Sequence, residues 1–158
     1  MENRVTEFFR EKGFDLTVQF TGEDTATVEK AAAVLGVAEG RIAKSLAFVL
    51  KDGTPIVLVV EGTARIDNRK YKDLFHCKAS MLSHEDTLAV TGFPVGGVCP
   101  FALPEQVRVY LDQSLQKYDT VFPAAGTPDS AVRIEVARFA EYTGGEWVDV
   151  CKLPEAAQ

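Results

Sequence analysis

The sequence of 158 residues lacks the motifs by which most enzyme families are identified. It has two histidines and three cysteines, and no Cys-x-x-Cys pair. This spacing argues against a disulfide framework and a structural zinc site, so we expect reduced thiols, no metal and no other cofactor. Walker, Gly-x-Ser-x-Gly, His-Glu-x-x-His and Gly-x-Gly-x-x-Gly motifs are missing too, which excludes several nucleotide-binding and hydrolase classes.

Long apolar runs and an excess of basic residues are also missing. The longest apolar runs, such as residues 56–60, are far shorter than the roughly 20 residues that span a bilayer. The chain begins without a signal-peptide pattern, so we expect a cytoplasmic protein with no membrane partner. A net charge of -6 opposes DNA binding and the coating of long nucleic acids, because such binding depends on neutralising phosphates. Contact with a short nucleic-acid end stays open.

One local group of cations departs from this acidic balance. Arg65, Arg69, Lys70 and Lys72 lie within eight residues, with Asp67 as the acidic residue between them. Two interpretations are open: an edge that faces phosphates, or the solvated face of a helix.

Length and a hydrophobic content of 46% are sufficient for one globular domain over residues 1–158. Hydrophobic periodicity and capping residues predict short strands irregularly interrupted by helices. This order favours an α+β fold with a mixed, barrel-like sheet of about six to eight short strands surrounded by helices, over a doubly wound parallel sheet. The predicted strands are 16–20, 43–50, 55–60, 107–111, 120–123, 131–136 and 147–150. An opening helix is predicted to end at residue 12, and a second helix begins at residue 25 or 27 and ends at residue 35. Further helices are predicted at 67–75, 83–91 and 137–142, with a helical turn at 112–117.

Residues 91–104 have the composition expected for the wall of a small-molecule site. Glycines and prolines alternate there with apolar residues, so we expect an anchored loop whose glycine amides approach a ligand closely. The apolar side chains of this loop are predicted to be buried. They are Phe93, Val95, Val98 and Phe101.

Two side chains could carry chemistry beside such a loop. Lys44 lies in an apolar, strand-like run and either extends to solvent or points into a cavity, where it would meet a negative or carbonyl-bearing ligand. Cys99 lies in the loop itself, where backbone amides could form an oxyanion hole for a Cys99-dependent hydrolase. Its apolar neighbours raise the pKa of a thiol and favour an inert cysteine.

Four segments together resemble a known family. Residues 27–37, 41–46, 95–101 and 109–115 read TVEKAAAVLGV, RIAKSL, VGGVCPF and VYLDQSL. In this order they resemble the YbaK/EbsC family, the prolyl-tRNA synthetase-associated editing domains. The match runs from about residue 25 to residue 150, and the fold it implies is a mixed, barrel-like sheet surrounded by helices.

The resemblance implies a stand-alone aminoacyl-tRNA deacylase. Its reaction would be hydrolysis of the ester that joins a small wrong amino acid, Cys, Ala, Ser or Thr, to the terminal adenosine of a tRNA, most of all tRNA(Pro). The implied partner is the aminoacylated 3′ end of tRNA, with prolyl-tRNA synthetase or an elongation factor as a candidate helper. Water would attack, activated by the 2′-hydroxyl or by a substrate thiol, with no metal and no protein nucleophile.

The same resemblance assigns roles to residues. Lys44 matches the functional lysine, which would bind the terminal phosphate or hold the ester. Gly96 and Pro100 match a Gly-x-x-x-Pro loop that frames the aminoacyl pocket, and the amides of Gly97 and Val98 are candidate donors to the carbonyl oxygen.

Two further positions belong to the pocket that the resemblance implies, and one alternative function stays open. Gly126 corresponds to a second loop of the pocket, and Ser45 stands where some branches have Asn or Thr, so the amino acid that is removed stays open. A non-catalytic binding or regulatory module, which recognises aminoacyl-tRNA or an amino-acid ligand, remains the alternative.

Overall fold

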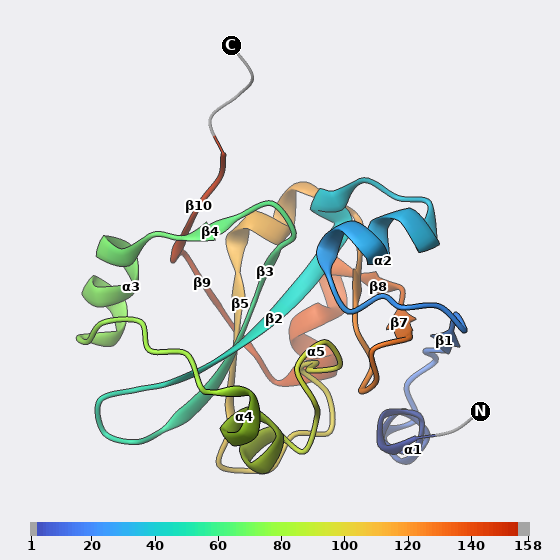
Figure 1. Cartoon of the computed structure of the whole chain (residues 1–158), viewed down its shortest axis with the longest axis horizontal. Coiled ribbons are helices and arrows are strands. Elements are labelled where there is room, and N and C mark those ends of the chain that lie inside the picture. The colour runs from blue at the N-terminus through green and yellow to red at the C-terminus, as the bar shows by residue number, and fades with distance from the viewer. Residues whose placement is uncertain (1–2, 155–158) are drawn as a thin grey trace.

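A long antiparallel hairpin forms the centre of the fold in the computed structural model, which describes residues 3–154 (Figure 1). Strand β2 (Ile42–Val49) pairs with β3 (Pro55–Glu61) from Ala43 opposite Glu61 to Val49 opposite Pro55. The turn between them contains Gly53 at φ 90°, a backbone conformation that favours glycine. Residues 56–60 of β3 are 0% exposed, as expected for an apolar strand that is covered on both faces.

Four more strands extend this hairpin into a curled six-stranded sheet with the order β8-β6-β2-β3-β5-β9. β6 (Thr120–Pro123) lies parallel to β2, and β8 (Ile134–Glu135) is antiparallel to β6. On the other side, β5 (Arg108–Asp112) lies parallel to β3, and β9 (Glu146–Val148) lies parallel to β5. Parallel and antiparallel pairs in one curled sheet, with helices around it, confirm the predicted α+β class.

Two short strand pairs lie outside the main sheet. β1 (Val18–Phe20) pairs with β7 (Ser130–Val132), and β4 (Arg65–Ile66) pairs with β10 (Cys151–Lys152). The strand predicted at 131–136 is therefore two strands in two different sheets. The two-residue strands β4 and β10 were not predicted, because so short a segment has no periodicity.

Helices begin and end at the residues that cap them. Thr27, rather than Thr25, caps the helix that precedes β2, and its side chain accepts from the amide of Lys30. Gly13 and Gly36 end the first two helices in the left-handed conformation, as predicted. The helices are α1 (Arg4–Lys12), α2 (Val28–Leu35), α3 (Asn68–Phe75), α4 (His84–Thr91) and α5 (Phe139–Thr143), with 3₁₀ turns η1 (Glu39–Arg41), η2 (Gln113–Lys117) and η3 (Val136–Arg138).

The two faces of the hairpin bury different cores. One face contributes Ala43, Val57 and Val59 to a core that includes the glycine-proline loop and α1. The opposite face packs Phe48 and Leu58 beneath α3 and the β4–β10 pair. Among residues 3–154, no helix has the length and apolar character needed to cross a membrane.

Candidate functional site

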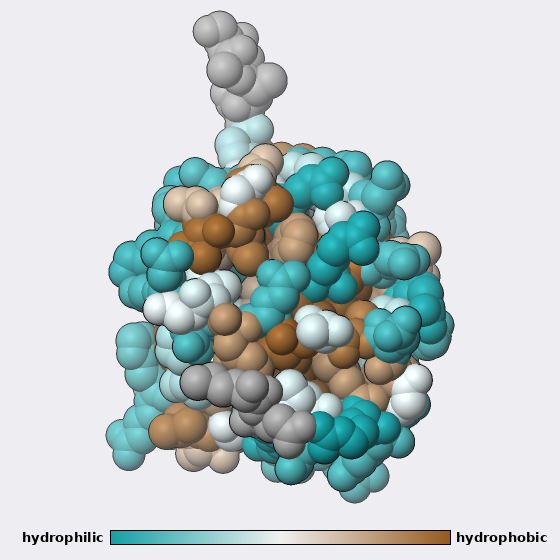
Figure 2. Space-filling view, turned by 90° about the vertical axis from the view of Figure 1, so that its right-hand side faces the viewer, coloured by the Kyte–Doolittle hydropathy of each residue, from teal (hydrophilic) through white to brown (hydrophobic). Residues whose placement is uncertain are grey.

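A cavity of about 250 Å³ lies along an edge of β2, between this strand, the start of α2 and the glycine-proline loop. Its walls are mainly apolar, and Lys44, Ser45, Gly96 and Val98 are among the residues that line it. The structure thus brings together four residues that the sequence analysis had assigned to one site. Figure 2 shows the side of the molecule on which α1, α2 and β7 lie, where apolar residues gather within a polar margin.

Within residues 3–154, the edge of β2 that borders the cavity has no partner strand beyond Ala43 until an isolated bridge at Phe48. Pairing with β6 ends where Ala43 lies opposite Pro123, and the chain next contacts this edge where the amide of Leu82 donates to the carbonyl oxygen of Ala47. Backbone groups of a strand alternate between its two edges, so the odd-numbered residues of β2 point away from β3. Ser45 is therefore left with its backbone N–H and C=O directed to the open edge.

The side chain of Ser45 adds a third unpaired group. Its Oγ is buried and has no hydrogen-bond partner within residues 3–154. A buried hydroxyl without a partner costs about 1–3 kcal/mol, so a native structure that contains one calls for an explanation. A polar ligand in the cavity would satisfy the hydroxyl and the two backbone groups together.

Lys44 supplies the positive charge at this edge. Its side chain is half-buried, and it forms no ion pair with any described residue. Burial lowers the pKa of its ammonium group below that of an ordinary lysine, and nearby acidic groups, Glu61 among them, partly offset this effect. An anion bound beside Lys44 would compensate for the lost hydration.

The glycine-proline loop is held by a second loop through Gly97 and Gly126. The Gly126 amide donates to the carbonyl oxygen of Gly97 at 3.0 Å, and the Gly97 amide donates to the carbonyl oxygen of Pro94 at 2.9 Å. Contrary to the sequence prediction, the Gly97 amide is thus not free to bind a carbonyl. Neither glycine lines the cavity, so their contact supports the loops that form its wall. The amide of Val98, which does line the cavity, has no hydrogen bond within the described chain.

Other loop residues differ from their predicted places. Phe93, Val98 and Phe101 are buried, but Val95 is 46% exposed at the rim, so its predicted burial is wrong. Val95 immediately precedes Gly96, which has φ 94° in the turn of this loop. Pro100 is buried and does not line the cavity.

Cys99 is placed where it cannot act as a nucleophile on a ligand in this cavity. It is 0% exposed and absent from the lining, and its thiol donates to the carbonyl oxygen of Phe101. Burial raises the pKa of the thiol to about 12, so the reactive thiolate is scarce at neutral pH. This geometry argues against the Cys99-dependent hydrolase.

The first helix and the residue that caps it contact both loops. The side-chain amide of Asn3 donates to the carbonyl oxygen of Ala125 at 3.0 Å. The guanidinium of Arg4 donates to the carbonyl oxygen of Thr91 at 2.8 Å and lies 4.1 Å from the ring centre of Phe93. The loop that precedes Gly126 and the loop that contains Gly96 are thereby fixed to one element.

Several lining residues were not assigned to the site from the sequence. Thr25, Ala26 and Thr27 border the cavity at the start of α2, and Ser130 borders it from β7. The capping pattern at residues 25–27 was visible, but nothing local shows that this end of the helix faces β2. No cluster of three or more His, Cys, Asp or Glu side chains suited to a metal occurs in the part of the chain that the structure describes.

The comparison with known families identifies the fold around this cavity. The family model described as "Aminoacyl-tRNA editing domain" matches residues 22–142. The chain belongs to this family. The match includes β2, the glycine-proline loop and the loop of Gly126, which confirms the resemblance drawn from the four segments. Helix α1, which braces the loops of this editing domain, lies outside the matched residues.

Three relatives show how far the similarity extends. The "Uncharacterized protein YwhH" of Bacillus subtilis is 43% identical over 152 residues, which are 96% of this chain and 88% of that protein. The "Putative Cys-tRNA(Pro)/Cys-tRNA(Cys) deacylase EbsC" of Enterococcus faecalis is 30% identical over 129 residues, or 81% and 79%. A solved structure described as a "putative trans-editing enzyme for prolyl tRNA synthetase" has a TM-score of 0.86 and 31% identity, and covers 94% of this chain and 95% of that one.

Proposed function

We propose that this editing domain removes a small non-cognate amino acid from the 3′ end of a mischarged tRNA, most of all tRNA(Pro). The observation that carries the proposal is that Lys44 and Ser45 line one small cavity, and that three polar groups of Ser45 have no hydrogen-bond partner among residues 3–154. An aminoacyl ester next to a phosphate requires such a set: one positive charge and several hydrogen-bonding groups in an apolar enclosure. Cys, Ala, Ser and Thr remain the candidate amino acids.

The reaction needs little chemistry from the protein, because an aminoacyl ester is already activated. Lys44 would bind the phosphate of the terminal nucleotide or the ester region, and would thereby orient the substrate. The free backbone amide of Ser45 is suited to donate to the carbonyl oxygen as negative charge develops there. We assign to Ser45, together with Val98, the role that the sequence analysis gave to Gly97 and Val98.

The groups that line the cavity support attack by water with help from the substrate. No histidine, cysteine or carboxylate is among the described residues of the lining. The general base would then be the neighbouring ribose hydroxyl, or the thiol of a cysteinyl substrate. Water adds to the carbonyl carbon, the bond to the ribose oxygen breaks, and that oxygen takes up a proton, which gives free amino acid and uncharged tRNA.

Discrimination against proline is expected to come from the shape of the cavity. One methylene group changes binding by only about 1–3 kcal/mol, so attraction of a smaller residue alone separates substrates poorly. Exclusion of a rigid ring by the backbone near Gly96 and by the start of α2 would separate them better. The added Cβ of any other residue at Gly96 would lie 2.9 Å from the Cβ of Ala26, which shows how closely these two walls approach.

The test is deacylation of tRNA(Pro) charged separately with Cys, Ala, Ser, Thr and Pro, each compared with the uncatalysed loss. We expect the wild-type protein to release one or two of the small amino acids at least about 100-fold faster than it releases proline. Equal rates with and without protein for all five substrates would contradict the proposal. Binding of the charged tRNA without turnover would then favour the non-catalytic binding module.

A further inference from the structure

Two cations lie directly opposite each other on the outer face of the β4–β10 pair. Arg65 is the register partner of Lys152, so the two side chains lie on the same face. The next pair, Ile66 and Cys151, faces the core, and both cations are therefore directed outwards and exposed. Like charges in this arrangement repel each other. Neither cation has an ion-pair partner within the described residues.

This cation pair lies near the cavity. Lys44 is opposite Val60 at the end of β3, and the chain reaches Arg65 after a turn in which the amide of Ala64 donates to the carbonyl oxygen of Glu61. In Figure 1, β4 and β10 lie at the same end of the sheet as the start of β2. The positive charge of Arg65 also contributes to the lowered pKa of Lys44, as expected for neighbouring cations.

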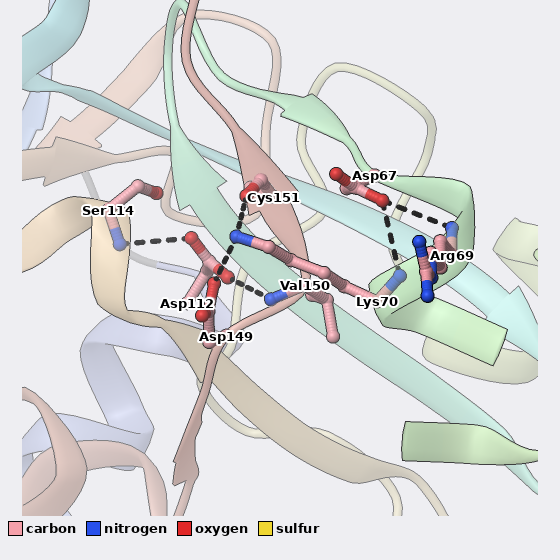
Figure 3. Close-up of polar contacts among 8 residues, drawn as sticks. All are labelled: Asp67, Arg69, Lys70, Asp112, Ser114, Asp149, Val150 and Cys151. Atoms are coloured by element: carbon pink, nitrogen blue, oxygen red, sulfur yellow. Dashed lines mark hydrogen bonds and ion pairs between the residues drawn. The ribbon is translucent and has the colours of Figure 1, made fainter. Parts of the chain in front are cut away.

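Strand β10 is held firmly, although it has only two residues. Asp112, which is 1% exposed, accepts from the amides of Ser114 and Val150 at 2.9 and 2.8 Å. Lys70 donates to the carboxylate of Asp149 and to the carbonyl oxygen of Cys151, both at 3.0 Å (Figure 3). This network fixes the backbone that leads into Lys152.

The cations that cluster within residues 65–72 of the sequence differ in their contacts. Lys70 is engaged with Asp149, and the amides of Arg69 and Lys70 are capped by Asp67, so this part of the cluster stabilises α3 (Figure 3). Arg65 lies on β4 instead, beside a cation from the opposite end of the chain. Arg65 is thus separated from the cations of α3.

We propose that Arg65 and Lys152 bind phosphate groups of the tRNA strand that leads to the aminoacylated adenosine. This inference rests on the proposed function, since it takes the cavity beside Lys44 as the place of that adenosine. A single strand that enters there would pass the β4–β10 pair, and its phosphates would relieve the repulsion between the two cations. The acidic chain, with its net charge of -6, would attract RNA through this local surface.

The test is the salt dependence of binding to uncharged tRNA(Pro), measured by fluorescence anisotropy for the wild-type protein and the double variant Arg65→Ala/Lys152→Ala. Each lost phosphate contact lowers the slope of log K against log salt by about 0.7 for a single strand, so we expect a decrease of about 1.4. At low salt, we expect the affinity to fall about ten-fold.

A matched control removes the same two charges elsewhere. Lys51 and Arg108 are exposed and lie at the hairpin-turn end of the sheet, so Lys51→Ala/Arg108→Ala is expected to keep the wild-type slope. Equal slopes for the two double variants, or no binding by the wild-type protein, would overturn the inference. Hydrolysis of the aminoacyl ester of adenosine 5′-monophosphate reports on the cavity alone. No hydrolysis by the wild-type protein would contradict the proposed function. Full hydrolysis by Arg65→Ala/Lys152→Ala, together with weaker tRNA binding, would support the inference.

Discussion

Replacement of Lys44 by Met is expected to lower the rate of deacylation by at least about 100-fold, the effect of removing one charge-stabilising group from an active site. The methionine side chain keeps most of the apolar stem of lysine but removes the charge. Because the ammonium is half-buried, unpaired and held at a lowered pKa, its removal relieves a desolvation cost. The melting temperature should therefore stay the same or rise while activity is lost.

The measurement is single-turnover deacylation together with thermal unfolding of the same samples. Lys51→Met is the control, because Lys51 is exposed in the hairpin turn and should keep both activity and stability. Lys44→Met with activity within three-fold of wild type would remove Lys44 from the reaction. A lowered melting temperature would instead indicate a structural role for the lysine.

Replacement of Gly97 by Ala is expected to lower both stability and activity. A Cβ at this position would lie 2.9 Å from the carbonyl carbon and oxygen of Gly126 and from the Cα of Thr127. All three are backbone atoms, so the clash can be relieved only by separating the two loops, which also breaks the hydrogen bond from Gly126. Overpacking of this kind costs about 2–3 kcal/mol, and we expect the melting temperature to fall by about 5–10 °C.

Activity of this variant should fall at least ten-fold even well below its melting temperature, because the moved loop forms a wall of the cavity. Gly53→Ala provides the control. Gly53 has φ 90° and open space around it, so the added methyl group costs about 1–2 kcal/mol of backbone strain with no clash. A Gly97→Ala protein that is no less stable than Gly53→Ala, with full activity, would show that the contact between the loops does not shape the cavity.

The elements best predicted from the sequence were those that depend on local interactions. Asp52 and Gly53 indicated the turn of the central hairpin, and Gly13 and Gly36 indicated the ends of two helices. These features depend on residues only a few positions apart, so they could be recognised without tertiary contacts. The order of short strands and helices predicted a barrel-like sheet, and the family resemblance agreed with it and assigned Lys44 and the glycine-proline loop to one site.

The missed features of the site depend on contacts between distant segments. Ser45 was assigned to the pocket, but its unpaired backbone groups follow from the point where β6 leaves β2. The support of the loops by Asn3 is a hydrogen bond to Ala125, 122 residues away. The Gly97 amide was taken as a free donor, because a local sequence does not show that Pro94 accepts from it within the turn.

The most direct test of the account is an NMR titration with a substrate analogue that cannot be hydrolysed, alanine joined by an amide bond to 3′-amino-3′-deoxyadenosine 5′-monophosphate. We expect the largest shifts of backbone amide signals at Lys44, Ser45, Gly96 and Val98, because these residues line the cavity. Shifts confined to residues 113–114, 116–117, 149 and 151–153, which border a separate hollow on the molecule, would contradict the placement of the aminoacyl ester beside Lys44.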